Sequence, residues 1–269
     1  MKKLLIFIIL LTTFNANANL DYGNFRKSTN NNGNVGYNII SWNSEEGIKL
    51  FEEAYYKKDF YNLAHHFEPQ INPLYCGIAS ITIILNALNQ GRYDIESLNI
   101  SKRPKKYGGE YIEFKKYTQN SILNKETDKI KSRKVINFKR KHKLYKKYDP
   151  GLTLSDLSEI MQSHDLSTQT FYAKEDLKSG ISEFKKQLIR NLNEKNRYII
   201  ANFYGPIFGG LTDGHISPIV AYNRKKNKIL ILEVASHKQP WNWVDLDLFY
   251  QAMQKVDIDK PRGFIVATK

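Results

Sequence analysis

The sequence predicts an α+β fold, with helices in the N-terminal half and an antiparallel sheet in the C-terminal half. Two observations predict this class. Apolar residues recur at helical spacing in several segments of the first two thirds, whereas the last third carries short runs of β-branched and aromatic residues. We find no internal repeat. Helices followed by strands are typical of α+β domains.

Local signals delimit the helices and strands. Asn43 and Ser44 can cap a first helix whose opening turn is acidic, which suits the helix dipole. Pro73 prevents a helix from running through the segment before Cys76, so that Cys76 falls at the N-terminal end of an apolar helix. The first predicted helix begins near residue 45, and three further helices are predicted at 78–88, 152–161 and 182–192. The predicted strands cover 198–203, 215–222, 229–234 and 263–267.

The beginning of the chain is predicted to lie outside the folded domain. A pair of lysines precedes an apolar run, and the small residues Ala16 and Ala18 form a cleavage site, which together predict a signal peptide at 1–18. An uncleaved amphipathic anchor is the alternative. Residues 19–38 are rich in Asn and Gly and predict a flexible leader. We therefore expect an exported protein, periplasmic or secreted, with one folded domain at 39–269.

Positive charge is concentrated in one segment. The chain has 41 Lys and Arg against 27 Asp and Glu, a net charge of +14. Residues 101–150 hold 17 basic and 5 acidic residues, a net charge of +12. We expect this segment to be a basic surface insertion whose partner is an anionic membrane surface or another polyanion. A solvated charged face without a partner is the alternative.

The chain contains one cysteine, Cys76, so it cannot form an intrachain disulfide. Exported proteins usually pair their cysteines. The count alone favours a small buried hydrophobic residue, but the position at a helix start suits a working thiol. Free backbone N–H groups and the helix dipole stabilise the thiolate there, and the thiolate is the nucleophilic form. Gly77, directly after it, would let a substrate backbone approach closely.

Among the six histidines, His215 is the best candidate for a base that acts with Cys76. It follows several glycines at a loop-to-strand junction, where the missing side chains leave room for a ligand. If the next turn centres near residues 224–225, Glu233 lies opposite or nearly opposite His215 on the returning strand. A carboxylate at that distance can orient the imidazole. The alternatives are a structural histidine and a glutamate that faces solvent.

Three stretches of the chain, in the same order, carry a resemblance to a known family. They are Gln70-x-x-Pro73-x-Tyr75-Cys76-Gly77-x-Ala79-Ser80, then Gly214-His215-x-Ser217-Pro218-x-x-Ala221-Tyr222, and finally Ile229-Leu230-Ile231-Leu232-Glu233-Val234-Ala235. These stretches resemble phytochelatin synthases, which are papain-like enzymes that act on glutathione. Weaker similarity extends over nearly all of the chain after the leader. The resemblance implies a papain-like cysteine protease fold.

The resemblance implies catalytic roles for four residues. Cys76 would be the nucleophile and His215 the base. Glu233 would orient His215, although the family normally has an aspartate at this position. Gln70 would donate from its side-chain amide to the oxyanion hole, beside the backbone N–H of Cys76.

The resemblance also implies a substrate-binding set. Gly77 and Gly214 would lie against the substrate, and Asp257 and Arg262 would hold the α-amino and α-carboxylate groups of the γ-glutamyl moiety. Family members carry an arginine shortly before the histidine, where this chain has Gly205. A contact with substrate or a feature needed for activation is therefore expected to be missing.

The implied reaction is acyl transfer. Cys76 would attack the carbonyl of the Cys–Gly bond in glutathione and release glycine. Water would resolve the thioester to γ-Glu-Cys, or a second glutathione would resolve it to a longer phytochelatin peptide. We expect hydrolysis to dominate. The alternatives are a mainly metal-dependent phytochelatin synthase, a general exported papain-like peptidase and a non-enzymatic protein that binds anionic surfaces.

We expect no bound cofactor and no metal site made by protein side chains. The chain has no second thiol to sense a metal, and His65-His66 alone is weak evidence for zinc. Cd²⁺ or Zn²⁺ would instead take part as thiolate complexes of glutathione. The sequence predicts no oligomeric state.

Overall fold

The computed structural model of the protein describes residues 28–29, 35–36, 39–89, 98–99, 115–136 and 151–269. The signal peptide predicted at 1–18 lies outside the described residues, so export stays a prediction. Within the described ranges, no helix is both long and apolar enough to pass through a bilayer.

Short strands occur in two places beside the main body of the structure. Within the leader predicted at 19–38, β1 (Ser28–Thr29) pairs antiparallel with β2 (Val35–Gly36). In the basic segment and just before it, β4 (Leu98–Asn99) pairs in the same way with β5 (Lys115–Lys116).

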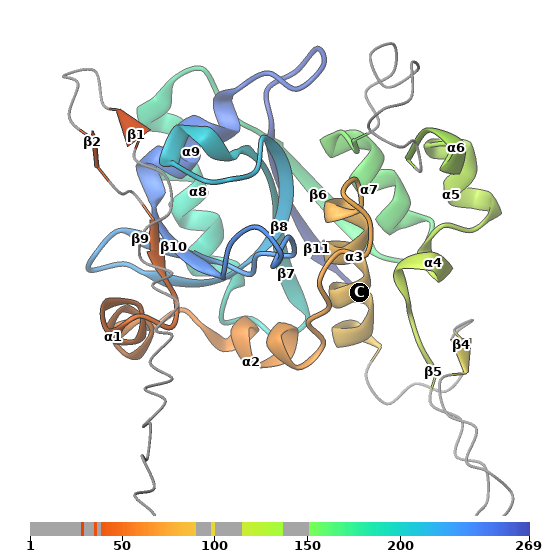
Figure 1. The fold of residues 1–269 in the computed structure, drawn as a ribbon, viewed down its shortest axis with the longest axis horizontal. Helices are drawn as coiled ribbons and strands as arrows, with labels where there is room; N and C mark the ends of the chain where they lie inside the picture. The colour runs from red at the N-terminus through yellow and green to blue at the C-terminus, as the bar shows by residue number, and fades with distance from the viewer. Residues whose placement is uncertain (1–27, 30–34, 37–38, 90–97, 100–114, 137–150) are drawn as a thin grey trace, which may run out of the picture.

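A seven-stranded sheet forms the centre of the molecule (Figure 1). Its strands are β3 (Ile39–Ser41), β6 (Ser167–Tyr172), β7 (Arg197–Tyr204), β8 (Gly214–Asn223), β9 (Lys228–Ile231), β10 (Asn242–Asp245) and β11 (Gly263–Thr268). They lie in the order β3-β10-β9-β8-β7-β11-β6, and every neighbouring pair is antiparallel. The strand β8, which begins just before His215, is therefore central.

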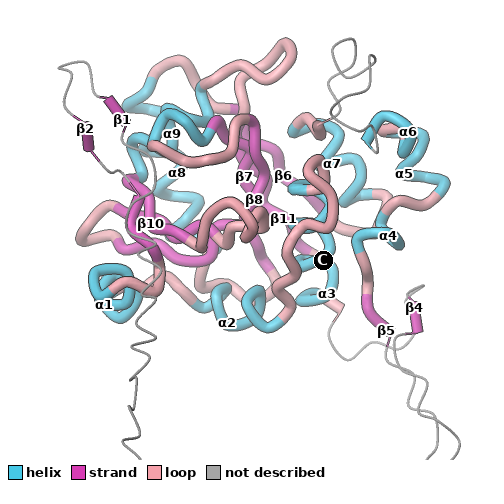
Figure 2. Tube along the Cα trace, viewed as in Figure 1, coloured by secondary structure: helices cyan, strands magenta, loops and turns pink. Residues whose placement is uncertain are grey.

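Helices cover both faces of this sheet. They are α1 (Glu45–Glu53), α2 (Lys58–His65), α3 (Cys76–Leu88), α4 (Gln119–Ile122), α5 (Lys125–Ile130), α6 (Arg133–Ile136), α7 (Leu154–Gln162), α8 (Leu177–Asn191) and α9 (Leu246–Gln254). A 3₁₀ turn, η3 (Gly205–Phe208), connects β7 to the loop before β8. Figures 1 and 2 show α3 and α7 on one side of the sheet and α8 and α9 on the other.

Alternate residues of β7 belong to two separate hydrophobic cores. Tyr198 and Ile200 pack in the core that includes α3 and α7. Ile199, Ala201 and Phe203 pack in the core that includes α8 and α9. Successive side chains of a strand point to opposite faces, so a strand with helices on both sides is apolar throughout. This explains the apolar run at residues 198–201 that marks β7 in the sequence.

The predicted α+β class is confirmed, but helices and strands are less separated along the chain than expected. The four predicted strands occur as β7, β8, β9 and β11, and β9 ends at Ile231, earlier than predicted. The sheet also recruits β3 from the N-terminal part and β6 from between two helices. The predicted cap is present, because the Ser44 side chain accepts a hydrogen bond from the Gly47 N–H.

The interpretation of residues 101–150 as a surface insertion needs correction where the structure describes them. Ile122 and Ile136 are fully buried in the same core as α3. Asn86 of α3 exchanges two hydrogen bonds with the backbone of Tyr117, at 2.7 and 3.0 Å. Lys116 forms an ion pair with Glu68. Residues 116–136 are therefore part of the folded domain, and residues 101–114 and 137–150 lie outside the described residues.

This correction predicts the effect of a point substitution on stability. Ile122→Ala should lower the free energy of unfolding by about 2–4 kcal/mol, because it leaves a cavity in a close-packed core. Urea unfolding followed by tryptophan fluorescence measures this. Ile48→Ala is the matched control, because Ile48 is 49% exposed and its loss should change stability by less than about 0.5 kcal/mol. Equal effects of the two substitutions would contradict the assignment of 116–136 to the core.

Candidate active site

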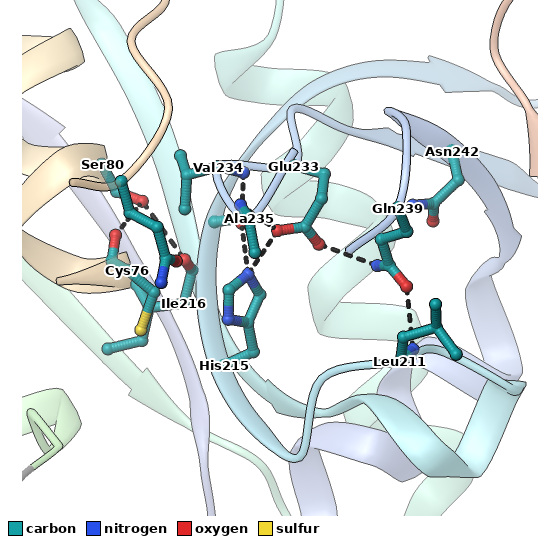
Figure 3. Close-up of polar contacts among 12 residues, drawn as sticks. Cys76, Ser80, Leu211, His215, Ile216, Glu233, Val234, Ala235, Gln239 and Asn242 are labelled. Carbon is teal, nitrogen blue, oxygen red and sulfur yellow. Dashed lines mark hydrogen bonds and ion pairs between the residues drawn. The ribbon is translucent and has the colours of Figure 1, made fainter. Parts of the chain in front are cut away.

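Cys76 is the first residue of α3, and its backbone is fixed against the strand that carries His215. Among the described residues, no side chain caps this helix, so its first N–H groups stay available to an anion at the thiol. Ser80, one turn further on, has its hydroxyl 2.8 Å from the Cys76 carbonyl and 3.3 Å from the Ile216 carbonyl. Its hydrogen can thus be donated to either carbonyl, which links the helix start to β8 beside His215 (Figure 3).

His215 is the second residue of β8 and is almost fully buried. Its Nε2 lies 2.5 Å from Glu233 Oε1 and 3.2 Å from the Ser217 hydroxyl. The Phe203 ring packs against the imidazole at a centroid distance of 5.6 Å and an angle of 79°. The other ring nitrogen, Nδ1, faces the side of Cys76 (Figure 3).

The register of β8 and β9 explains how Glu233 reaches His215. Ile219 pairs with Ile231, and the Leu232 N–H continues the ladder by donating to the Pro218 carbonyl at 2.9 Å. Glu233 therefore lies diagonally across from His215, two residues beyond the end of β9. A diagonal neighbour is farther away than a directly opposed one. The longer side chain of glutamate spans this distance.

The Glu233 carboxylate is completely buried and has further hydrogen-bond donors. Oε1 accepts a hydrogen bond from the Ala235 N–H at 2.7 Å, and Oε2 accepts one from Gln239 Nε2 at 2.8 Å. Gln239 in turn accepts a hydrogen bond from the Leu211 N–H at 2.8 Å. Sequence reasoning missed Gln239, because no spacing rule relates a residue in a loop to the strand that precedes it.

Electrostatic interactions keep the His215–Glu233 pair ionised. Burial alone would lower the pKa of His215, but the Glu233 carboxylate and the contact with Cys76 raise this pKa to about 10. Burial alone would raise the pKa of Glu233, but His215, the Ala235 N–H and Gln239 hold it below its usual value. An imidazolium therefore faces Cys76 at neutral pH.

A cavity of about 230 Å³ opens next to Cys76 and His215. Its wall also includes Gly214, Asp257 and Arg262, so that five of the eight predicted site residues line one cavity. Glu233 lies behind His215 and does not line it. The cavity is small, with a nucleophile, a histidine and an Asp–Arg pair around it.

Arg262 and Asp257 form a partly buried ion pair in the cavity wall. Arg262 Nη2 lies 2.9 Å from Asp257 Oδ1, and Asn202 Nδ2 donates to Asp257 Oδ2 at 2.9 Å. Arg262 Nη1 donates to the backbone carbonyls of Lys255 and Val256 at 3.0 and 2.6 Å. The buried Arg262 Nε finds no acceptor within the described part of the chain.

The three glycines singled out in the sequence have different surroundings. A Cβ at Gly214 would lie 2.9 Å from Arg262 Nη2, so Gly214 makes room for Arg262 in the cavity wall. A Cβ at Gly77 would lie 2.8 Å from the Leu152 side chain, which also lines the cavity, so Gly77 permits close packing of α3. Its contact with a substrate stays a prediction. At Gly205 a Cβ would lie 2.2 Å from the Thr212 carbonyl oxygen.

Gln70 lies in the loop before Cys76 and is held from both sides. Its backbone N–H donates to the Val234 carbonyl at 2.9 Å, and its side-chain amide donates to the Asn72 carbonyl at 2.9 Å. The Gln119 side chain from the basic segment accepts from the Ile71 N–H at 3.0 Å and donates to the Pro69 carbonyl at 2.9 Å. Gln119 therefore fixes the backbone on either side of Gln70, a role that the sequence did not suggest.

The described residues contain no group of three or more His, Cys, Asp or Glu side chains suited to hold a metal ion. His65 and His66 stack edge to face, with ring centroids 4.7 Å apart, and point to no third ligand in that part of the structure.

The pKa shifts of the pair predict how stability depends on pH. The pKa of His215 is raised above its ordinary value of 6.5, so its contribution is complete below pH 6.5 and is lost as the pH rises through about 10. The pKa of Glu233 is lowered from 4.5, so its contribution is lost as the pH falls below that value. The difference in free energy of unfolding between wild type and Glu233→Gln should therefore be largest between pH 4.5 and 6.5.

Urea titrations between pH 4 and 10 measure this difference. The control is Glu194→Gln at an exposed position, where the difference from wild type should not follow the same pH course. A difference between wild type and Glu233→Gln that stays constant from pH 5 to 10 would show that the buried pair is not ionised.

The phytochelatin synthase family model matches residues 31–264. The glutathione gamma-glutamylcysteinyltransferase 1 of Arabidopsis thaliana is 28% identical over 237 residues, which cover 86% of this chain and 42% of the plant protein. The glutathione gamma-glutamylcysteinyltransferase of Schizosaccharomyces pombe is 26% identical over 232 residues, 84% of this chain and 48% of the yeast protein.

The chain thus spans less than half the length of these two relatives. Among solved structures, the peptidase domain of Streptococcus ComA matches with a TM-score of 0.37 and 13% identity, over 76% of this chain and 98% of that domain. This structural likeness is too weak to define the fold. The family match, in contrast, extends over most of the chain and includes Cys76, His215 and Glu233. The chain belongs to the phytochelatin synthase family.

Proposed function

We propose that this protein has a papain-like fold and catalyses acyl transfer on glutathione through a thioester at Cys76. The observation that carries the proposal is the shared cavity, in which Cys76 and His215 face a buried Asp257–Arg262 pair. A nucleophile and a histidine alone would fit many acyl transfers. The charged pair restricts the substrate to one that brings both an ammonium and a carboxylate group.

The proposed first step cleaves the Cys–Gly amide of glutathione. The Cys76 thiolate attacks the carbonyl carbon, and the His215 imidazolium gives its proton to the nitrogen of the leaving glycine. The raised pKa of His215 means that this proton is present at neutral pH. Glycine leaves, and a γ-glutamylcysteinyl thioester stays on Cys76.

The second step regenerates the thiol. Neutral His215 takes a proton from water, the hydroxide attacks the thioester carbonyl, and γ-Glu-Cys leaves as Cys76 returns to the thiolate. The amine of a second glutathione can replace water, and the product is then a longer peptide. In both steps, Glu233 stays hydrogen-bonded to Nε2 of His215, so that Nδ1 stays directed toward Cys76.

We propose that Asp257 and Arg262 recognise the γ-glutamyl end of glutathione. The α-ammonium group would lie against the Asp257 carboxylate, and the α-carboxylate would accept from Arg262. The buried Nε of Arg262, which lacks an acceptor in the described residues, supports this assignment. A buried donor without a partner is unfavourable, and a bound carboxylate would supply its partner.

Gln70 is proposed to stabilise the oxyanion together with the Cys76 backbone N–H. Its amide nitrogen carries two hydrogens, of which one is donated to the Asn72 carbonyl. The second would be donated to the oxyanion as it forms. Preorganised donors of this kind contribute strongly to acyl transfer, and Gln119 supports the preorganisation by fixing the loop at Pro69 and Ile71.

The proposal predicts a covalent intermediate. After rapid quenching, the mature protein mixed with glutathione should carry γ-Glu-Cys as a thioester on Cys76, visible by mass spectrometry of the intact chain. Cys76→Ala should release no glycine while keeping its circular dichroism spectrum. His215→Ala should slow glycine release about 100-fold or more, since a positioned acid–base group contributes that much. Full activity of Cys76→Ala would exclude the proposed nucleophile.

The proposal also predicts the product ratio. Chain extension needs an acceptor site beside the thioester, and Gly205 replaces a basic residue that would help to hold an anionic acceptor. We expect γ-Glu-Cys and glycine as the main products at modest glutathione, with longer peptides rising with glutathione concentration. Cd²⁺ should change glycine release only slightly, because it would act as a thiolate complex of the substrate.

Product analysis by mass spectrometry, with and without Cd²⁺, tests this ratio. Mostly extended peptides, formed in strong dependence on Cd²⁺, would favour the alternative of a metal-dependent phytochelatin synthase. Cleavage of unrelated peptides at rates similar to glutathione would instead favour a general peptidase.

A further inference from the structure

Gln239 is buried beside Glu233 but has no role in the catalytic steps proposed above. It lies in the loop between β9 and β10, is 2% exposed, and has both ends of its amide engaged. Nε2 donates to Glu233 Oε2 at 2.8 Å, and Oε1 accepts from the Leu211 N–H at 2.8 Å (Figure 3). The amide thus connects Glu233 to the loop that precedes His215.

The geometry of Glu233 makes a second restraint on its carboxylate necessary. Glutamate has one more rotatable bond than aspartate, and Glu233 reaches His215 diagonally across the strand pair. The contacts at Oε1, from His215 and Ala235, fix one oxygen. Rotation of the carboxylate about that oxygen would change the angle at which Oε1 meets the imidazole. Gln239 prevents this rotation by holding Oε2.

We propose that Gln239 is a positioning residue, which holds the Glu233 carboxylate in the orientation that directs His215 toward Cys76. Its contact with Leu211 adds a second effect. Residues 211–213 lie in the loop before β8, and Asp213 at its end and Gly214 at the start of β8 line the cavity. One buried amide therefore fixes both the acid behind His215 and one wall of the cavity in front of it.

Reaction of Cys76 with iodoacetamide provides a test that does not require the proposed substrate. The chain has a single cysteine, so alkylation reports on that thiol alone. The rate depends on the thiolate, which an oriented imidazolium stabilises. Glycine release from glutathione, measured in parallel, rests on the proposed function. If the Gln239 variants change the alkylation rate as expected but wild type releases no glycine from glutathione, the proposed function is disproved and the role of Gln239 is not.

Two variants separate positioning from packing. Gln239→Leu keeps the approximate volume and removes both hydrogen bonds, and alkylation at pH 6 should slow about tenfold relative to wild type. Gln239→Glu keeps an acceptor for the Leu211 N–H but can donate to Glu233 only while its own carboxyl is protonated. Its alkylation rate relative to wild type should therefore be near one at pH 5 and fall about tenfold by pH 8.

The pH course is the diagnostic result, because a loss of packing would slow alkylation equally at all pH values. Several charged groups lie near this network and are unchanged in both variants. They are His215 and Glu233 within it, Asp213 on the facing loop, and the exposed His237 and Lys238 on the same turn as Gln239.

Gln187 in α8 offers a matched control that makes no hydrogen bond to this network. Its side chain is similarly buried in α8, donates to Glu183 Oε1 at 2.8 Å and accepts from Asn191 Nδ2 at 3.0 Å. Gln187→Leu and Gln187→Glu should leave the pH profile of alkylation unchanged. The proposal is overturned if Gln239→Glu, folded by circular dichroism at pH 5 and pH 8, keeps a constant ratio to wild type. It is equally overturned if the Gln187 variants reproduce the pH-dependent loss.

Discussion

The burial of the Glu233 carboxylate is the constraint on which the architecture of the site depends. A carboxylate without exposure to water is strongly unfavourable unless it is paired and fully hydrogen-bonded. Here the partners come from three directions: the His215 imidazole at the start of β8, the Ala235 backbone just after β9, and the Gln239 amide in the following loop. Their positions fix where β9 must end and how the chain returns toward β10. The same carboxylate keeps His215 protonated, so one buried charge determines both the local fold and the chemical state of the site.

The nucleophile belongs to a different part of the molecule, and two contacts bring it into register with this pair. Ser80 links the first turn of α3 to β8, and the Gln70 N–H links the preceding loop to Val234. Gln119 then holds that loop from outside. Part of the segment with most of the positive charge is thus fastened to the loop before Cys76. A polyanion bound to this segment would act on a part of the protein that is mechanically connected to the site.

Features that depend on residues close together in the chain could be predicted from the sequence. The cap at Ser44, the helix starting at Cys76 and the pairing of β8 with β9 all follow from local patterns, and the last of these was enough to bring Glu233 near His215. The edge strand β6 was missed, because its polar, half-exposed residues lack the apolar alternation that marks a strand. The role of Gln119 could not be predicted, since it depends on a contact between segments far apart in the chain. Gln239 lies only six residues after Glu233, but in a loop, where no local pattern indicates the direction of a side chain.

Gly205 shows how the loop before His215 limits the routes by which such a site can evolve. Its missing side chain lets the Thr212 carbonyl approach so closely that no other residue fits without a change in the path of the loop. The arginine expected from the family pattern therefore cannot be introduced here by one substitution. Thr212 and its neighbours would have to move first, and until then an arginine would disrupt the turn that leads to His215. The order of mutational steps is thereby constrained, and residues 205–213 are expected to be inherited, exchanged or transplanted between relatives as one unit.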